Sequence, residues 1–152
     1  MKPLTTIKPP TERSDQTAEH KPSAQPVMLV YYAAVVFFNL CLTAQVLTVG
    51  LAYFYNPAWW NLHVWLVRSY SGVSLLLLGG AWYLPLPQRI KALATGLPIL
   101  LGLQFLTIHL RMPLSVPVPL SVLHPLIGFS LFSVSTTLVH RMKHVLWPQP
   151  AV

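Results

Sequence analysis

The chain has 152 residues, of which 54% are hydrophobic and only 9% are charged, and its formal net charge is +7. A soluble domain carries about 25% charged residues, so this composition excludes an ordinary soluble protein and is typical of an integral membrane protein. The only acidic residues are Glu12, Asp15 and Glu19, which excludes paired-carboxylate catalysis and an Asp/Glu proton relay in the rest of the chain. The basic residues flank apolar runs and do not cluster with aromatic residues, so nucleic acid is not expected as a partner.

In chain order, the first segment is a polar tail. Residues 1–26 are rich in Pro, Thr, Ser and charge, which predicts disorder. Four apolar segments follow, and each reaches the roughly 20 residues that a helix needs to cross a bilayer. They cover residues 27–55, 59–84, 90–110 and 120–147, and residues 148–152 form a short C-terminal tail. Because the backbone in hydrocarbon must satisfy its own hydrogen bonds, the sequence predicts an all-α, integral-membrane four-helix bundle over residues 27–147 in contact with the lipid bilayer.

The connections between the spans are short and carry turn residues. Asn56 followed by Pro57 predicts a helix N-cap with proline in the first helical position of the second span. The other two connections contain the sequences PLP at Pro85–Pro87 and MPLSVPVP at Met112–Pro119.

A short sequence occurs twice in the apolar region. QVLTVGL begins at Gln45 and QFLTIHL begins at Gln104, and about twenty residues later each copy reaches a histidine, His63 or His124. Coincidence between Leu-rich helices is the alternative explanation. A true duplication predicts two repeated helix hairpins, related by a pseudo-twofold axis along the membrane normal. That axis would place the two histidines at equivalent depths, facing each other.

The histidine pair suggests a cofactor. Neutral imidazole is a good ligand for iron, and helix bundles hold cofactors between facing helices. The pair therefore predicts one haem b between the second and fourth spans, with His63 and His124 as its metal ligands. Gly128 lies one helical turn after His124 and would leave room for the porphyrin. Alternatively, both histidines are polar interface residues bonded to loop carbonyls.

Three further residues are candidates for the same site. Arg68 lies inside the second span with no acidic partner, which is costly unless it reaches the interface, a lipid phosphate or a haem propionate. Arg111 lies at the same membrane face and could also compensate propionate charge. His109 either lines the site or is simply polar at the interface. His140 and His144 lie one turn apart, but they lack a third ligand for a metal.

The sequences LHVWLVRSYSGVSLLL and VLHPLIGFSLF, together with the two glutamine-containing copies, carry a family resemblance. Over roughly residues 40–141 the chain resembles the small four-span bacterial proteins of the DUF6220 family of unknown function. Its plan is also similar to one half of haem A synthase, a four-helix bundle with histidines on its second and fourth helices. The resemblance implies a haem-bearing bundle in a bacterial plasma membrane or internal membrane.

The chain also departs from these patterns. Haem A synthase has a carboxylate shortly before its second-helix histidine, whereas PAWWNLH in this chain has none. In addition, Val64 stands where the family typically has an arginine after the histidine. The resemblance therefore implies haem binding without methyl oxidation of haem.

Two function classes follow. The first is a small b-type cytochrome that transfers single electrons, with a quinone or a membrane redox protein as partner. The second is a cofactor-free structural or assembly subunit of a larger membrane complex, in which the glycines serve helix packing. An enzyme acting on a lipid or quinone is the weakest hypothesis, because no Ser/His/Asp set and no nucleotide motif is present.

The distribution of basic residues predicts the topology. Eight of the ten lysines and arginines lie on one side of the membrane if both termini are cytoplasmic. Reporter fusions within residues 80–87 and within residues 115–119 should therefore report opposite sides of the membrane. If both loops report the same side, the four-span topology is wrong.

Overall fold

The computed structural model describes residues 24–109 and 120–148, and each predicted span is a helix. The helices are α1 (Ala24–Phe54), α2 (Trp59–Tyr83), α3 (Gln88–His109) and α4 (His124–Leu146), with a short 3₁₀ helix η1 (Leu120–Leu123) directly before α4. All four long segments are long and apolar enough to cross a membrane. The predicted all-α, multi-pass membrane fold is confirmed.

The start of α1 and the predicted cap of α2 differ from the structure. Helix α1 begins at Ala24, three residues before the predicted boundary. Pro26 is tolerated there because an N–H in the first helical turn has no intrahelical partner to lose. The predicted N-cap at Asn56 is wrong: α2 begins at Trp59, and the residue before it, Ala58, makes no side-chain cap. Instead, Asn56 Oδ1 accepts a hydrogen bond from the Ala58 N–H (2.9 Å), which folds a turn ahead of the helix.

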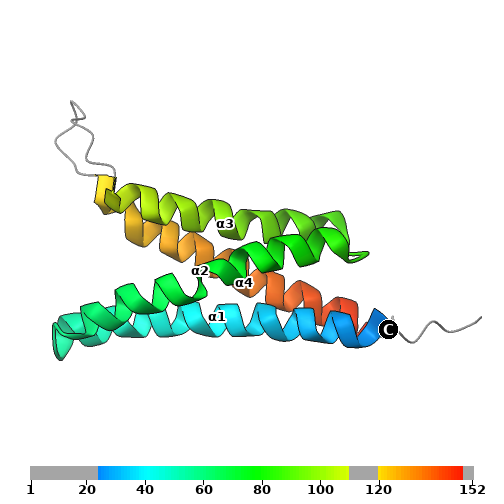
Figure 1. The fold of residues 1–152 in the computed structure, drawn as a ribbon, viewed down its shortest axis with the longest axis horizontal. Coiled ribbons are helices and arrows are strands. Elements are labelled where there is room, and N and C mark those ends of the chain that lie inside the picture. Colours follow the sequence, from blue (N-terminus) through cyan, green and yellow to red (C-terminus); the bar gives the residue numbers. More distant parts are fainter. Residues whose placement is uncertain (1–23, 110–119, 149–152) are drawn as a thin grey trace, which may run out of the picture.

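The helices form a four-membered ring in which each packs against two neighbours. The packed pairs are α1–α2, α2–α3, α3–α4 and α1–α4, and among the described residues neither diagonal pair makes contact. The hairpins α1–α2 and α3–α4 lie close together at the end that contains the start of α1. They diverge toward the end where α1 turns into α2 and η1 leads into α4 (Figure 1).

The buried positions of the two hairpins coincide. Buried residues of α1 correspond to buried residues of α3 at an offset of 59 positions. In α1 these residues are Tyr31, Val35, Phe38, Leu42 and Thr48. The residues 59 positions later in α3 are also buried: Ile90, Ala94, Leu97, Leu101 and Thr107. In α2 and α4 the same holds at an offset of 61 positions, for Tyr70, Ser74, Leu77 and Ala81 against Leu131, Ser135, Leu138 and Met142. The predicted hairpin repeat is therefore also seen in the buried positions of the four helices.

The core fills only part of the length of the bundle. In α2 the first buried residue is Tyr70, and in α4 it is Leu131. Residues 59–69 and 120–130 contain no buried side chain, although they make up the opening turns of η1, α2 and α4. Burial at this end comes from contacts within each hairpin, at Thr48, Ala52 and Thr107. The end where the hairpins diverge therefore has no shared core.

Polar side chains link the helices where the core is closed. The Tyr31 hydroxyl donates to the Leu77 carbonyl (3.0 Å) and joins α1 to α2. Asn39 Nδ2 donates to Ser135 Oγ (3.2 Å) and to Thr136 Oγ1 (3.0 Å), which joins α1 to α4. Hydrogen bonds of this kind add to packing in helix association, because lipid tails are as apolar as the helix interface.

The repeated core predicts matched effects of substitution. Leu77 is 1% exposed and its counterpart Leu138 is 0% exposed. Leu77→Ala and Leu138→Ala should each lower the free energy of unfolding by about 1–3 kcal/mol, chiefly through the cavity and lost packing. Leu76→Ala, at a site that is 74% exposed, should change it by less than about 0.5 kcal/mol. Denaturant unfolding in mixed micelles would test this, and an equal effect at Leu76 would contradict the assigned core.

Candidate functional site

Gln45 of α1 binds the histidine at the start of α2. Its Nε2 donates to the His63 carbonyl (2.9 Å) and contacts His63 Nε2 (3.1 Å). On the other side of the ring, His63 Nδ1 faces the Gln45 carbonyl (3.3 Å) and Thr48 Oγ1 (3.2 Å). A carbonyl only accepts and an amide nitrogen only donates, so these contacts assign the proton to Nδ1 and leave Nε2 as the acceptor.

The second hairpin repeats this cluster. His124 Nδ1 faces the Gln104 carbonyl (3.3 Å), and the Thr107 hydroxyl donates to the same carbonyl (2.9 Å). The amide of Gln104 finds partners for both of its atoms in one orientation. In that orientation its nitrogen contacts His124 Nδ1 (2.5 Å) and, at a longer distance, Nε2 (3.2 Å), and it donates to the His124 carbonyl (3.0 Å), while its oxygen accepts from the Gly128 N–H (2.9 Å). Each glutamine therefore fixes the histidine of its own hairpin.

The sequence analysis missed this pairing. It matched glutamine with glutamine and histidine with histidine, but it did not connect the two types. The signal was available, because a glutamine near the end of one span and a histidine near the start of the next meet in an antiparallel hairpin. The carbonyls that bind the imidazoles also come from helical residues, Gln45 and Gln104, and not from loops as the alternative interpretation expected.

Gly128 makes room for Gln104 in this structure. A Cβ at this position would lie 2.6 Å from the nearest amide atom of Gln104. The space that the sequence analysis reserved for a porphyrin thus holds a side-chain amide. The counterpart of Gly128 in the first hairpin is Val67, and there Gln45 Oε1 is buried without a hydrogen-bond partner among the described residues. The two clusters therefore differ in the partner of the amide oxygen and in the ring nitrogen nearest to the amide nitrogen, which is Nε2 in His63 and Nδ1 in His124.

His63 and His124 lie at the diverging end of the bundle. Both are half-buried. The Trp60 ring packs edge-on against His63, with 5.2 Å between the ring centroids. The arrangement presents two imidazoles from opposite hairpins, each covered by a glutamine amide. Two neutral imidazoles in this setting can accept hydrogen bonds or bind a metal.

The other predicted residues lie apart from this pair or cannot be placed. Arg68 is exposed, at the position that corresponds to the exposed Phe129 in α4. His109 is exposed, and its Nδ1 faces the Phe105 carbonyl of its own helix (2.8 Å). Arg111 lies outside the described residues. Within residues 24–109 and 120–148, no group of three or more His, Cys, Asp or Glu side chains could hold a metal ion.

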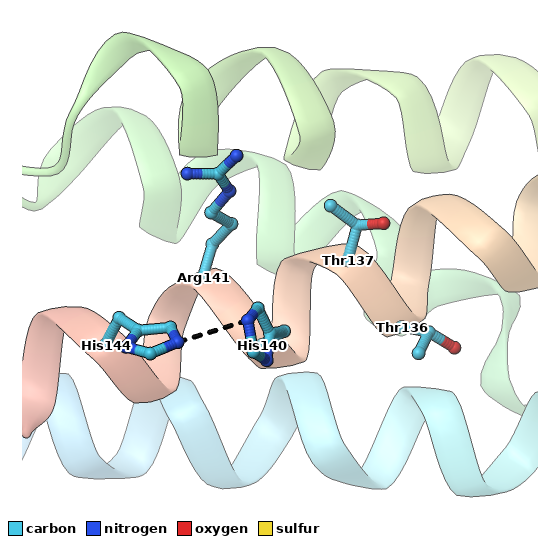
Figure 2. A pocket seen from close by; sticks show the side chains of 5 residues that line it. All are labelled: Thr136, Thr137, His140, Arg141 and His144. Atoms are coloured by element: carbon cyan, nitrogen blue, oxygen red, sulfur yellow. Dashed lines mark hydrogen bonds between the residues drawn. The ribbon is translucent and has the colours of Figure 1, made fainter.

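His140 and His144 form a separate pair at the opposite end of α4. Their Nε2 atoms are 3.1 Å apart, and both side chains are exposed. Figure 2 shows them together on one side of the helix, with Thr136, Thr137 and Arg141 nearby. This pair does not belong to the site at His63 and His124.

Comparison with known proteins gives one family match. Residues 45–109 match the model of a family of unknown function (DUF6220). This match confirms the resemblance over those residues, which run from the Gln45 cluster to the end of α3. No curated protein and no solved structure matches the chain.

The Gln104 cluster predicts a loss of stability when the amide is removed. Gln104→Leu should remove the side-chain hydrogen bonds between α3 and α4 and lower the free energy of unfolding by about 1–2 kcal/mol, given roughly 0.6 kcal/mol for an average hydrogen bond between membrane helices. Gln88→Leu, at the exposed start of α3, is the matched control and should have little effect. Thermal unfolding in detergent would measure both, and equal midpoints for Gln104→Leu and wild type would rule out a stabilising role for the amide.

Proposed function

We propose that this multi-pass membrane protein binds one haem b between α2 and α4 and transfers single electrons, with His63 and His124 as the axial ligands. The observation that carries the proposal is the repeated Gln–His cluster. Each hairpin holds one imidazole whose Nδ1 faces a backbone carbonyl and whose ring contacts a glutamine amide. We place the protein in a bacterial plasma or internal membrane, with both termini in the cytoplasm.

The donor set supports a haem. Metal-binding histidines almost always donate their other ring N–H to a carbonyl or carboxylate, which fixes the ring and its tautomer. Here the Gln45 and Gln104 carbonyls are in that position. A side-chain amide, which can rotate, covers each Nε2 and would have to give way to iron. The hairpins also share no buried core at residues 59–69 and 120–130, so packed side chains do not close this end between them.

The remaining residues would have supporting roles. A haem iron with two imidazole ligands supplies reversible one-electron transfer. The described helices carry no carboxylate. No acidic side chain of these helices would therefore compete with the haem propionates for the basic side chains. Arg68 and Arg111 are the proposed cations, and His109 is a further candidate for a propionate contact. A quinone or a membrane redox protein would be the electron partner.

One observation favours a different function. Both Nε2 atoms already contact a glutamine amide, so neither imidazole needs a metal to satisfy its hydrogen-bonding capacity. In a cofactor-free structural or assembly subunit, the clusters would fasten the two helices of each hairpin. The diverging end would then receive a helix of a larger complex. The presence or absence of haem separates these two functions.

The haem proposal predicts a specific pattern of variants. Wild-type protein purified from haem-replete cells should show a Soret band and sharp low-spin bands on reduction. His63→Ala and His124→Ala should each abolish the low-spin bands, because each removes one axial ligand. His140→Ala and His144→Ala should leave them unchanged, since α4 rises about 1.5 Å per residue and these residues lie roughly 24 Å or more from His124.

His109→Ala is the second control and should also retain the low-spin bands. Loss of these bands in His109→Ala but not in His63→Ala would assign the wrong ligand pair. Absence of any Soret band in wild-type protein supplied with haem would refute the cytochrome and favour the cofactor-free subunit. Circular dichroism of each variant should retain the helical signal, which separates loss of a ligand from loss of the fold.

A further inference from the structure

A groove runs between α3 and α4 at the end opposite the histidine pair. It has a volume of about 370 Å³. Arg89 and Arg141 line it from the two helices, and Leu93, Gly96 and Val134 form an apolar wall. Arg141 and Thr137 point from α4 toward α3, on a different side of the helix from His140 and His144 (Figure 2).

The two exposed guanidinium groups form a site of positive charge. They line the same groove, and the described helices contain no carboxylate that could lie between them. Lys91, the other cation at the start of α3, lies over the Trp82 ring at 5.4 Å and does not line the groove. Guanidinium groups bind phosphate through paired, charge-assisted hydrogen bonds. The charge at this end of the groove is therefore complementary to a phosphodiester.

The apolar wall matches the other part of a lipid. A Cβ on Gly96 would lie 3.6 Å from Val134 Cγ1, so a larger side chain would fill the groove. Because the groove lies along two membrane-spanning helices, its apolar part faces the acyl region of the bilayer. A molecule that joins a phosphate to an acyl chain would meet both parts at once.

The first hairpin differs at the positions that correspond to this groove, although its core positions are the same. The counterparts of Arg89 and Arg141 are Val30 and Gly80, and the counterpart of Gly96 is Phe37. The Tyr31 ring lies against Gly80, only 2.8 Å from where a Cβ would be. Charge and space are thus present together on one side of the pseudo-twofold axis only.

We propose that the α3–α4 groove binds an anionic glycerophospholipid of the adjoining leaflet. Its phosphate lies between Arg89 and Arg141, and one acyl chain lies on Leu93, Gly96 and Val134. Basic pockets between membrane helices are a recurring way to bind anionic head groups. The site is independent of the haem proposal, because it lies at the other end of the bundle.

Native mass spectrometry of the full chain in detergent would test the site, with phosphatidylglycerol and phosphatidylcholine added in equal amounts. Wild-type protein should retain one phosphatidylglycerol, with about tenfold preference over phosphatidylcholine. The double variant Arg89→Gln/Arg141→Gln should lose that preference. Gly96→Leu keeps both charges but fills the groove, and it should lower retention of phosphatidylglycerol to a similar degree.

The matched control is Lys91→Gln/Lys143→Gln, which removes the same charge from the same end of the bundle but not from the groove. It should retain the preference. Equal loss in the control and in Arg89→Gln/Arg141→Gln would overturn the proposal in favour of general attraction of anionic lipid. No preference in wild-type protein would also overturn it.

Discussion

The bundle must satisfy its polar groups inside a membrane without using a single carboxylate. In hydrocarbon an unpaired polar group is costly, and here the helices contain only neutral acceptors. Gln45 and Gln104 meet this constraint, because each has a donor and an acceptor and can bind a histidine, a backbone carbonyl and a backbone N–H. Asn39 and the hydroxyl groups act in the same way in the core. The histidine sites therefore depend on the hydrogen bonds that hold each hairpin together.

The repeat organises the rest of the molecule. The pairs α1–α4 and α2–α3 pack to the same extent, and their buried residues occupy equivalent positions. The two hairpins differ at a few positions outside this common core, and these positions change the hydrogen bonds and the space that each hairpin offers. Val67 replaces Gly128 beside the first cluster, which leaves Gln45 Oε1 without a partner among the described residues. At the other end, Phe37 of the first hairpin corresponds to Gly96, which lines the groove of the second hairpin.

Much of the fold could be predicted from the sequence, because span length and hydropathy are local properties. The four helices agree closely with the predicted spans, and the repeat of Gln45 and His63 in Gln104 and His124 indicated the pseudo-twofold arrangement. The turn ahead of α2 could not be predicted, because Asn56 can cap a helix or close a turn with the same side-chain oxygen. The relation of Gln104 to Gly128 depends on how closely two helices approach, which local patterns do not encode.

The matched core has a consequence for how such a protein could arise. A single hairpin with this buried pattern already has the surface needed to pair with a copy of itself, since its first helix packs on the second helix of the other copy. The axis of that homodimer would be the present pseudo-axis. In a homodimer, however, the two hairpins have the same sequence, so each feature is present in both hairpins or in neither. Joining the two copies in one chain is what allows Tyr31 to cover one groove while Arg141 lines the other.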